Sequence, residues 1–388
     1  MIARLDVDLG AIRRNVARLR ALASPARYAA VVKANAYGHG LVPVARAIAD
    51  DVDAFCVYRV EEAADLRAAG IATPILVLGP VERDELATAY ATASSVALWS
   101  TGGFRGAAAA LARSRGGRFP VHAKIDTGVT RLGLDRDRAT EAIATYLADP
   151  GLALRGAFTH LAAAEELESA YTLEQLRRFE RALEPLGPVL RERRVVRHAA
   201  ASAAAMLFAN LRLDMIRAGI ATYGIWPSNE TRDAVPPDFT LEPALTWTTK
   251  LVVVREVEAG RPVGYGCTFV TTRPSRIGVL PIGYAEGLPR ALSGRGVALA
   301  GGVRVPFVGR VCMNMAFVDV TEAPVVHAGS TVTLIGRDGD ASLDANAFAD
   351  GAGTIGYEIV ARLPAVIPRA YVGEERRAEP LAFTRRSN

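Results

Sequence analysis

The first 220 residues of the chain alternate between short apolar runs and segments with helical spacing, and this alternation constrains the fold most. The apolar runs, such as 74–78 (PILVL), are typical of strands covered on both faces. The segments between them, such as 61–69 and 172–186, have the spacing of helices, and Asp8 suits the N-cap of the first helix. Strands are predicted at 28–33, 54–58, 74–79, 94–99, 119–126, 152–160, 195–199 and 214–220. Eight parallel strand–helix units favour a closed (β/α)8 barrel, the TIM barrel, over an open doubly wound sheet.

The second part of the chain has a different pattern. Residues 226–237 are polar and rich in proline, which is typical of a linker. Beyond this linker the apolar residues recur with a period of two, and one short helix is expected at 343–349. The period-two runs lie at 251–254, 277–280, 303–307 and 331–335. We therefore expect two domains: a barrel formed by residues 1–233 and a mostly antiparallel β domain formed by residues 234–388.

Composition limits the class of protein. The chain has 388 residues, of which 50% are apolar and 22% are charged, as in ordinary soluble enzymes. Arg4 and Asp6 place charge where a signal peptide would be apolar, and no apolar run is long enough to cross a membrane. Cys56, Cys267 and Cys312 are too few and too scattered for a disulfide framework or a zinc site. The net charge of +5 comes from dispersed arginines without a nucleic-acid-binding motif. We expect a cytoplasmic protein with no metal, membrane or nucleic-acid partner.

The unusual polar residues of the first region fall where its predicted strands end. In a barrel of this kind, catalytic groups lie at the carboxyl ends of the strands. The residues at these ends are Lys33 after the first strand, Lys124, Asp126 and Arg131 at the fifth, His160 at the sixth, Ser202 after the seventh, and Arg217 and Gly219 at the eighth. Each has an ordinary structural alternative, such as a strand-end histidine with satisfied hydrogen bonds. Their convergence on one rim is what indicates a catalytic site.

Two lysines and a set of hydrogen-bond donors at this rim suggest a cofactor. The chain has only three lysines, and Lys33 and Lys124 lie at the rim. A lysine amine can lose its proton and form a Schiff base with a carbonyl, whereas a guanidinium stays protonated. The alternative for Lys33 is a strand-end lysine whose ammonium reaches solvent. Ser202 and the amides of Gly219 and Ile220 would supply donors to a phosphate. A phosphate site opposite a lysine predicts pyridoxal 5′-phosphate.

The sequence also resembles a known family. Residues 32–40 (VKANAYGHG) are similar to the cofactor-lysine signature of the alanine racemases. Further similar motifs follow in order over nearly the whole chain, at 124–128 with Arg131, 217–220 with 223–224, 264–266, 283–287, 309–313, 357–358 and Arg369. The resemblance implies a fold-type III pyridoxal-phosphate enzyme that racemises alanine, a small amino-acid substrate. It also implies a head-to-tail homodimer with shared active sites.

The resemblance assigns catalytic roles to four residues. Lys33 would carry the cofactor as a Schiff base and would act as the base on one face of the substrate Cα. Tyr265 of the partner subunit would act on the other face, because racemisation needs a proton to leave one side and arrive on the other. Arg217 would face the pyridine nitrogen as a donor that keeps its proton, and His160 would brace this arginine.

The resemblance also assigns binding roles. The cofactor phosphate would be held by Tyr37, Ser202, Gly219, Ile220 and Tyr357. The substrate carboxylate would be bound by Arg131 and the Met313 backbone amide. Lys124 matches a position that can be carbamylated and then pairs with that arginine. The channel by which substrate reaches the site would be lined by Glu165, Tyr284, Arg290 and Arg310.

Two positions depart from the family pattern, and three alternative functions remain. Ala201 stands where the family usually has asparagine, and Asn314 stands where it usually has aspartate. Losing one hydrogen bond to a charged phosphate costs roughly 1.5–3 kcal/mol, which a covalently held cofactor tolerates. Both departures bear on substrate range more than on reaction type, so one alternative is a racemase of broader specificity.

Two further alternatives are a decarboxylase and a cofactor carrier. A decarboxylase of the same fold type would need a carboxylate in place of Arg217. A single-domain cofactor carrier would lack the β domain. The D-alanine product would serve peptidoglycan synthesis or catabolism.

Overall fold

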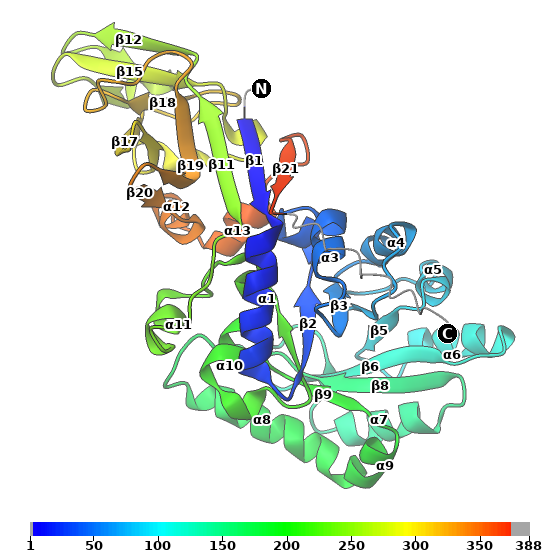
Figure 1. Cartoon of the computed structure of the whole chain (residues 1–388). Helices are drawn as coiled ribbons and strands as arrows, with labels where there is room; N and C mark the ends of the chain where they lie inside the picture. Colours follow the sequence, from blue (N-terminus) through cyan, green and yellow to red (C-terminus); the bar gives the residue numbers. More distant parts are fainter. Residues whose placement is uncertain (1–2, 374–388) are drawn as a thin grey trace, which may run out of the picture.

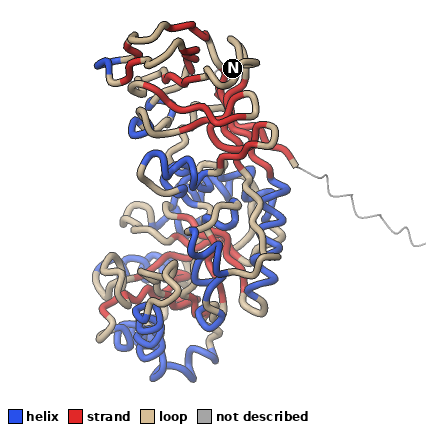
Figure 2. Tube along the Cα trace, turned by 90° about the vertical axis from the view of Figure 1, so that its left-hand side faces the viewer, coloured by secondary structure: helices blue, strands red, loops and turns tan. Residues whose placement is uncertain are grey.

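The protein has two structural parts, a barrel surrounded by helices and a second part dominated by strands (Figures 1 and 2). The computed structural model describes residues 3–373. Figure 2 shows the strands of the second part gathered at one end of the molecule, while helices surround the strands of the barrel at the other end. Within residues 3–373, no helix is long and apolar enough to span a membrane.

Eight parallel strands form the barrel. They are β2 (Arg27–Val31), β3 (Ala54–Val57), β4 (Ile75–Val77), β5 (Ser95–Leu98), β6 (Phe119–Asp126), β8 (Leu152–Phe158), β9 (Val196–His198) and β10 (Met215–Ala218). They pair in the order β10-β2-β3-β4-β5-β6-β8-β9, and a two-residue strand, β7 (Leu134–Asp135), pairs with β6. Across the seam between β9 and β10, the Asp214 N–H donates to Arg197 O (3.1 Å) and the Arg217 N–H donates to Ala200 O (2.9 Å). The eight strands lie at the predicted positions, so the TIM-barrel prediction is confirmed.

Helices cover the outside of the barrel (Figure 1). They are α1 (Leu9–Ala23), α3 (Leu41–Ile48), α4 (Val60–Ala68), α5 (Leu86–Ala91), α6 (Gly103–Ser114), α7 (Ala139–Ala148), α8 (Ala170–Leu183), α9 (Gly187–Glu192) and α10 (Ser202–Leu207). Asp8 caps α1 as predicted, because its Oδ1 accepts a hydrogen bond from the Ala11 N–H (2.9 Å). Ile12, Val16 and Leu19 lie on the buried face of this helix. Apolar side chains between strands and helices thus form the core that holds the barrel rim in place.

The second part contains a mostly antiparallel sheet, as predicted. Its strands are β1 (Ala3–Asp8), β11 (Leu245–Lys250), β12 (Val253–Val257), β15 (Ser275–Leu280), β16 (Val297–Ala300), β17 (Val303–Val308), β18 (Ala316–Asp319), β19 (Thr331–Asp338), β20 (Ala341–Leu343) and β21 (Arg369–Val372). The order along the sheet is β12-β15-β18-β17-β16-β19-β11-β1-β21, with β20 paired to β19. Trp247, Phe307 and Phe348 are fully buried side chains of this part.

The first strand of the chain was not predicted, and it belongs to the second sheet. β1 pairs antiparallel with β11 and parallel with β21. Residues 3–8 therefore do not belong with the barrel, to which the predicted range 1–233 assigns them. Buried Ala3, Leu5 and Val7 alternate with the charged residues Arg4, Asp6 and Asp8. The segment therefore has the period-two pattern of a strand, which the predicted strands did not include. The predicted boundary between residues 233 and 234 stays a prediction.

Short helices connect the two parts. The predicted linker at 226–237 contains α11 (Asn229–Ala234), which Ser228 caps through its hydroxyl. The short helix predicted at 343–349 is α12 (Ala345–Ala352), and a further helix, α13 (Gly356–Ala361), follows it. α13 packs against the turn that carries Lys33, because a Cβ atom on Gly38 would overlap the Val360 carbonyl. The second part of the chain therefore supports the barrel rim directly.

Candidate active site

Lys33 lies where β2 meets an unusual turn. Residues Ala34, Asn35, Ala36 and Tyr37 all have φ between 52° and 55°, so they form a left-handed turn without a glycine. Such a conformation costs roughly 1–2 kcal/mol per residue. Hydrogen bonds offset part of this cost. The Glu62 carboxylate accepts from the Ala34 N–H (2.7 Å), and the Asn35 side-chain oxygen accepts from the N–H of Leu41 (2.8 Å).

The Lys33 amine has the properties of a nucleophile. It is half-buried, and burial lowers its pKa below the ordinary value. The positive charge of Arg131 lowers this pKa further, while the carboxylate of Glu62 opposes the shift. A lower pKa increases the fraction of neutral amine at physiological pH, which is the form that attacks a carbonyl.

The predicted phosphate-binding residues lie together. The Ser202 hydroxyl accepts from the N–H groups of Gly219 (3.0 Å) and Ala221 (3.4 Å). The Tyr37 hydroxyl lies beside Gly219, since a Cβ atom there would be 2.5 Å from Tyr37 Oη. The ring centroids of Tyr37 and Tyr357 are 6.4 Å apart. Ile220 is the first residue of the short helix η3 (Ile220–Tyr223) and lies between Gly219 and Ala221 in the chain. The backbone at 219–221 thus lies against the Ser202 hydroxyl, and the contact of the Ala221 amide was not predicted.

Arg217 is a buried cation held by several acceptors. Its residue is only 4% exposed, and burial lowers its pKa to about 10. Its Nη2 donates to the carbonyl oxygens of Thr159 (2.8 Å) and Ala199 (3.0 Å). Its guanidinium carbon lies 5.2 Å from the centroid of the Phe158 ring. These contacts fix the direction of the guanidinium within the barrel mouth.

The histidine in hydrogen-bond contact with Arg217 in this chain is His198, and the bracing role predicted for His160 stays a prediction. Arg217 Nη1 lies 2.7 Å from His198 Nδ1, and His198 Nε2 lies 2.9 Å from His122 Nδ1. No hydrogen bond of the His160 imidazole occurs among the described residues, although its backbone carbonyl accepts from Gln175 (3.1 Å). His198 is the last residue of β9 and points into the barrel, whereas His160 lies two residues beyond the end of β8.

Several cations nevertheless surround His160. Burial lowers its pKa to about 3, and the charges of Arg217, Arg131, Lys124 and Lys33 act in the same direction. The side chain is therefore a neutral imidazole within the field of all four cations. Four positive charges near one side chain favour an anionic ligand.

Lys124 and Arg131 lie on the same rim. Lys124 is 7% exposed, and its pKa is lowered to about 8 by burial and then by Arg131 and Arg217. Its Nζ lies 5.8 Å from the centroid of the Phe158 ring. Asp126 shapes the loop that carries Arg131, because its Oδ1 accepts from three successive N–H groups, at 128, 129 and 130 (2.9–3.1 Å). Asp126 therefore orders the loop through hydrogen bonds.

The remaining predicted residues divide between the rim and the second domain. Glu165 is on the rim side, where its carboxylate accepts from the Tyr357 hydroxyl (3.4 Å). Tyr265 opens the 3₁₀ turn η4 (Tyr265–Cys267) and is 74% exposed. Tyr284 opens η5 (Tyr284–Glu286), and Arg290 opens η6 (Arg290–Leu292). Tyr284 and Arg290 line one pocket.

Tyr265, Tyr284, Arg310 and Met313 form a group of their own. The Arg310 guanidinium lies over Gly266, where a Cβ atom would be 2.9 Å from its Cζ. The Tyr284 N–H donates to Cys312 O (3.0 Å), next to Met313. Within residues 3–373, no hydrogen bond, ion pair or ring contact joins this group to the rim residues. The fold of one chain therefore produces two sets of predicted site residues.

Comparison with known proteins agrees with the fold and shows the family. The family model described as "Alanine racemase, N-terminal domain" matches residues 7–227, and that of the "Alanine racemase, C-terminal domain" matches residues 244–371. The alanine racemase of Desulfosudis oleivorans is 40% identical over 94% of this chain and 95% of its own. A crystal structure of the Bacillus anthracis alanine racemase with bound L-Ala-P matches this structure with a TM-score of 0.86 and 35% sequence identity. The match covers 96% of each chain.

A third comparison concerns a structure with a cofactor. The alanine racemase of Bartonella henselae, described with covalently bound pyridoxal phosphate, has a TM-score of 0.86 at 28% identity and covers 96% of this chain and all of its own. The matched models and structures are those of alanine racemases, which are isomerases, and they cover both the barrel and the antiparallel second part. The chain belongs to the alanine racemase family of enzymes.

Proposed function

We propose that this protein catalyses the pyridoxal-phosphate-dependent interconversion of L- and D-alanine. The proposal rests on one observation above all: Lys33, with its lowered pKa, ends β2 on the rim that also carries Arg217 and the Ser202–Gly219 donor cluster. The family relationship supports it independently, since both family models are of alanine racemase and together they span most of the chain.

The residues of the rim fit the cofactor. Ser202, the Gly219 and Ile220 amides and the hydroxyls of Tyr37 and Tyr357 would hold its phosphate. The fit is supported by the Ser202 hydroxyl, because two backbone N–H groups donate to its oxygen and leave its own O–H to donate to a phosphate oxygen. Ala201 contributes no side-chain donor. When bound, pyridoxal phosphate withdraws electrons from the Cα of an amino acid and so makes its proton acidic.

Two residues would move this proton. The Lys33 amine would take it from, or return it to, one face of the substrate Cα. The phenol of Tyr265 of the partner subunit would do the same on the opposite face. Arg217 would donate a hydrogen bond to the pyridine nitrogen. A buried guanidinium keeps its proton in this role, so the nitrogen would remain unprotonated and side reactions would be disfavoured.

Arg131 and Lys124 would act together at the substrate carboxylate. Arg131 would bind the carboxylate together with the Met313 backbone amide. Lys124 would be carbamylated, which requires a neutral amine, and its pKa of about 8 supplies this form near physiological pH. A carbamate would add a negative charge beside Arg131 and would hold its guanidinium in place.

A homodimer would complete the site. Tyr265 is exposed, and no contact joins it to the rim within the described chain, which supports delivery of this phenol by a second copy. The channel to the shared site would be lined by Tyr284, Arg290, Arg310 and Glu165. We also propose a cytoplasmic location and a role in supplying D-alanine for peptidoglycan.

The alternatives receive less support. A decarboxylase would need a carboxylate at the position of Arg217. A single-domain cofactor carrier would not need the second domain, which matches the racemase family at 244–371. A broader racemase differs only in the substrates that it accepts.

One assay tests the proposed function. Purified protein loaded with pyridoxal phosphate is incubated with single enantiomers of alanine, serine and other amino acids, and the other enantiomer is measured by chiral chromatography. We expect rapid interconversion of alanine and its loss in Lys33→Ala. Cofactor-loaded protein that converts no amino acid would overturn the proposal, and equal rates for several substrates would favour the broader racemase.

A further inference from the structure

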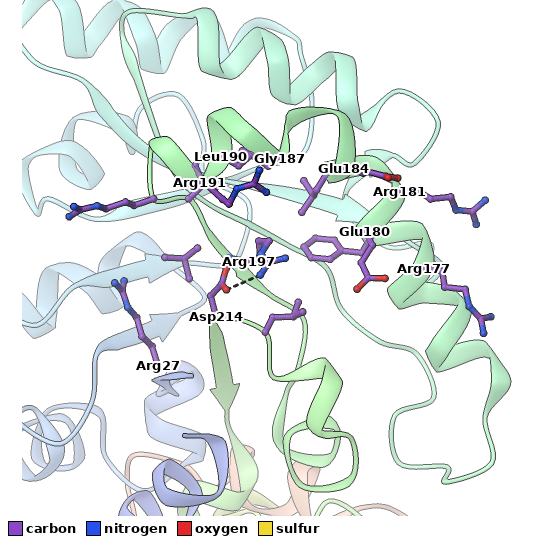
Figure 3. A pocket seen from close by; sticks show the side chains of 16 residues that line it. Arg27, Arg177, Glu180, Arg181, Glu184, Gly187, Leu190, Arg191, Arg197 and Asp214 are labelled. Carbon is purple, nitrogen blue, oxygen red and sulfur yellow. Dashed lines mark hydrogen bonds and ion pairs between the residues drawn. The ribbon is translucent and has the colours of Figure 1, made fainter. Parts of the chain in front are cut away.

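Figure 3 shows a groove bordered by α8, η1 (Glu184–Leu186) and α9. It has a volume of about 890 Å³, and its lining includes the first residues of β2 and β9 and the residues just before β10. These strand ends are opposite to the barrel rim that carries Lys33. Arg27 begins β2, and Lys33 follows the other end of this strand. A strand rises about 3.3 Å per residue, so roughly 20 Å separate the two residues. The groove is therefore distinct from the candidate active site.

Arginine dominates the lining of this groove, which we call the arginine groove. Its arginines are Arg27, Arg177, Arg181, Arg191, Arg194 and Arg197. Only three carboxylates lie among the lining residues, namely Glu180, Glu184 and Asp214. The lining thus carries an excess of positive charge, which attracts anions by electrostatic steering.

One of these carboxylates is already engaged. Asp214 accepts from the guanidinium of Arg197 at two oxygens (3.0 Å each) and from the Arg197 backbone N–H (2.8 Å). Burial alone would raise the pKa of Asp214, but these hydrogen bonds bring the pKa below its ordinary value. This pair fixes the seam between β9 and β10, and Asp214 neutralises Arg197.

Three arginines of the groove have no such partner. Arg177 and Arg181 share Glu174 of α8 (3.6 and 3.2 Å). Within residues 3–373, no ion pair joins Arg27, Arg191 or Arg194 to a carboxylate. Figure 3 shows Glu180 and Glu184 on the side of α8, with Arg27 and Arg191 toward the other side of the groove. The charge of the groove is therefore divided, and an anion would bind at the side of α9 and β2.

The floor of the groove is apolar. Phe179, Leu183, Leu190 and Val195 are buried side chains that line it. Its volume is within the range of roughly 300–1,000 Å³ that is typical of small-molecule pockets. Guanidinium groups match phosphate oxygens in geometry as well as charge, and an apolar floor suits a planar ring. We propose that the arginine groove binds a phosphate ester of about mononucleotide size, with its phosphate at Arg27, Arg191 and Arg194.

Calorimetric titration tests this proposal. Full-length protein is first saturated with pyridoxal phosphate, so that the phosphate positions at the rim are filled. ADP, inorganic phosphate and adenosine are then titrated separately at low ionic strength, because salt screens exposed charges. We expect saturable binding of ADP, weaker binding of inorganic phosphate, and none of adenosine, which has no charge.

Matched variants locate the site. Arg191→Ala combined with Arg194→Ala is expected to weaken ADP binding by roughly ten- to a hundredfold, since each lost charge-assisted hydrogen bond weakens binding by about tenfold. The control combines Arg83→Ala with Arg115→Ala, two exposed arginines outside the groove that make the same change in net charge. This control should retain ADP affinity within roughly twofold.

The outcomes are distinct. Replacing Arg191 and Arg194 by lysine keeps the charge and should weaken ADP binding less than alanine does. Absence of saturable ADP binding would overturn the proposal, as would equal weakening in the groove and control variants. Binding of an aspartate-rich peptide without binding of ADP would also overturn it, because the groove would then serve a protein partner. Thermal unfolding checks that each variant is folded.

Discussion

The Nδ1 atom of His198 accepts a hydrogen bond from the Arg217 guanidinium at 2.7 Å. A guanidinium has only donors, so His198 must carry its proton on Nε2. That proton faces His122 Nδ1 at 2.9 Å, and His122 must in turn carry its proton on its own Nε2. Arg217 therefore fixes the tautomers of two buried histidines. Burial, Arg217 and His122 together hold the pKa of His198 well below its ordinary value, which keeps the acceptor available.

Removal of this acceptor should impair the proposed reaction. His198→Leu leaves a buried guanidinium N–H without a partner, which costs roughly 1.5–3 kcal/mol. We expect kcat/KM for alanine to fall by roughly ten- to a hundredfold. His198→Gln should lose less, because its amide oxygen can accept from Arg217. Steady-state racemisation assays on both variants, with thermal unfolding as a control, check this. Equal losses in the two variants would argue against the acceptor role.

Buried histidines should make the fold sensitive to mild acid. Burial lowers the pKa of His39 to about 4 and of His122 and His160 to about 3, and His198 is also lowered well below its ordinary value. In the unfolded chain these groups bind protons near pH 6.5. Stability is therefore full above pH 6.5 and falls as the pH drops toward about 4. Between pH 7.5 and 5.5 we expect a loss of up to about 5 kcal/mol, measured by urea unfolding.

Two variants test the cause of this pH dependence. His122→Gln should reduce the slope of stability against pH between 5.5 and 6.5 by roughly one quarter, because it removes one of four proton sites. His327→Gln changes an exposed histidine and should leave the slope unchanged. A slope that is the same in all three proteins would assign the acid sensitivity to other groups.

Glycine should relieve the strain of the turn after Lys33. Ala34 has φ of 52° and is exposed, so Ala34→Gly loses little packing. We expect an increase in unfolding free energy of about 0.5–1 kcal/mol, because a left-handed residue with a Cβ costs more than the added freedom of glycine. Ala17→Gly is the matched control in the middle of the right-handed helix α1 and should destabilise by about 1 kcal/mol. If Ala34→Gly and Ala17→Gly both destabilise the fold, the proposal that Ala34 is strained is contradicted.

The barrel and most of the rim could be predicted because both depend on local pattern. Strand ends bring Lys33, Lys124, Ser202 and Arg217 to one rim once the barrel is recognised. The contact of His198 with Arg217 could not be predicted in this way. It depends on where each strand stops and on which side chain then points inward, which sequence positions predict only to within a few residues.

Two other features left no clear signal in the sequence. The left-handed turn at 34–37 has no glycine within it, so the usual mark of positive φ is missing. β1 has a period-two pattern, but it joins a sheet whose other strands come more than 230 residues later, and no local pattern predicts such a long-range pairing. The proposed pairing of Tyr265 with a second copy would likewise depend on assembly.

Asn314 should position the Met313 loop. Its side-chain amide donates to Glu286 Oε1 (2.7 Å), while Glu286 Oε2 accepts from the Gly283 N–H (2.8 Å). The Ala285 N–H in turn donates to Met313 O (2.9 Å). Asn314→Asp would place two carboxylates side by side, where like charges repel each other. We expect KM for alanine to rise by roughly two- to fivefold at low ionic strength, with a smaller effect at high ionic strength, because salt screens exposed charges.

The second half of this test is a rescue. Adding Glu286→Gln to Asn314→Asp restores a donor and an acceptor, and KM should return toward the original value at both ionic strengths. A KM increase that is the same at low and high ionic strength, or that the second change leaves unaltered, would show that charge repulsion is not its cause. The comparison separates an electrostatic effect from a loss of packing, because both variants keep the side-chain volume nearly constant.

Tyr265→Phe should impair the two directions of the proposed reaction unequally. The change removes only the phenolic hydroxyl of an exposed side chain, so the fold of each chain should be unaffected. A positioned acid–base group contributes roughly 10²- to 10⁴-fold to proton transfer. We expect loss of the Cα proton from L-alanine in D₂O, followed by NMR, to slow by at least about a hundredfold, whereas loss from D-alanine depends on Lys33 and should slow far less. Tyr284→Phe, a neighbouring phenol, should leave proton loss from both enantiomers nearly unchanged. Equal slowing for L- and D-alanine in Tyr265→Phe would mean that a single base serves both faces.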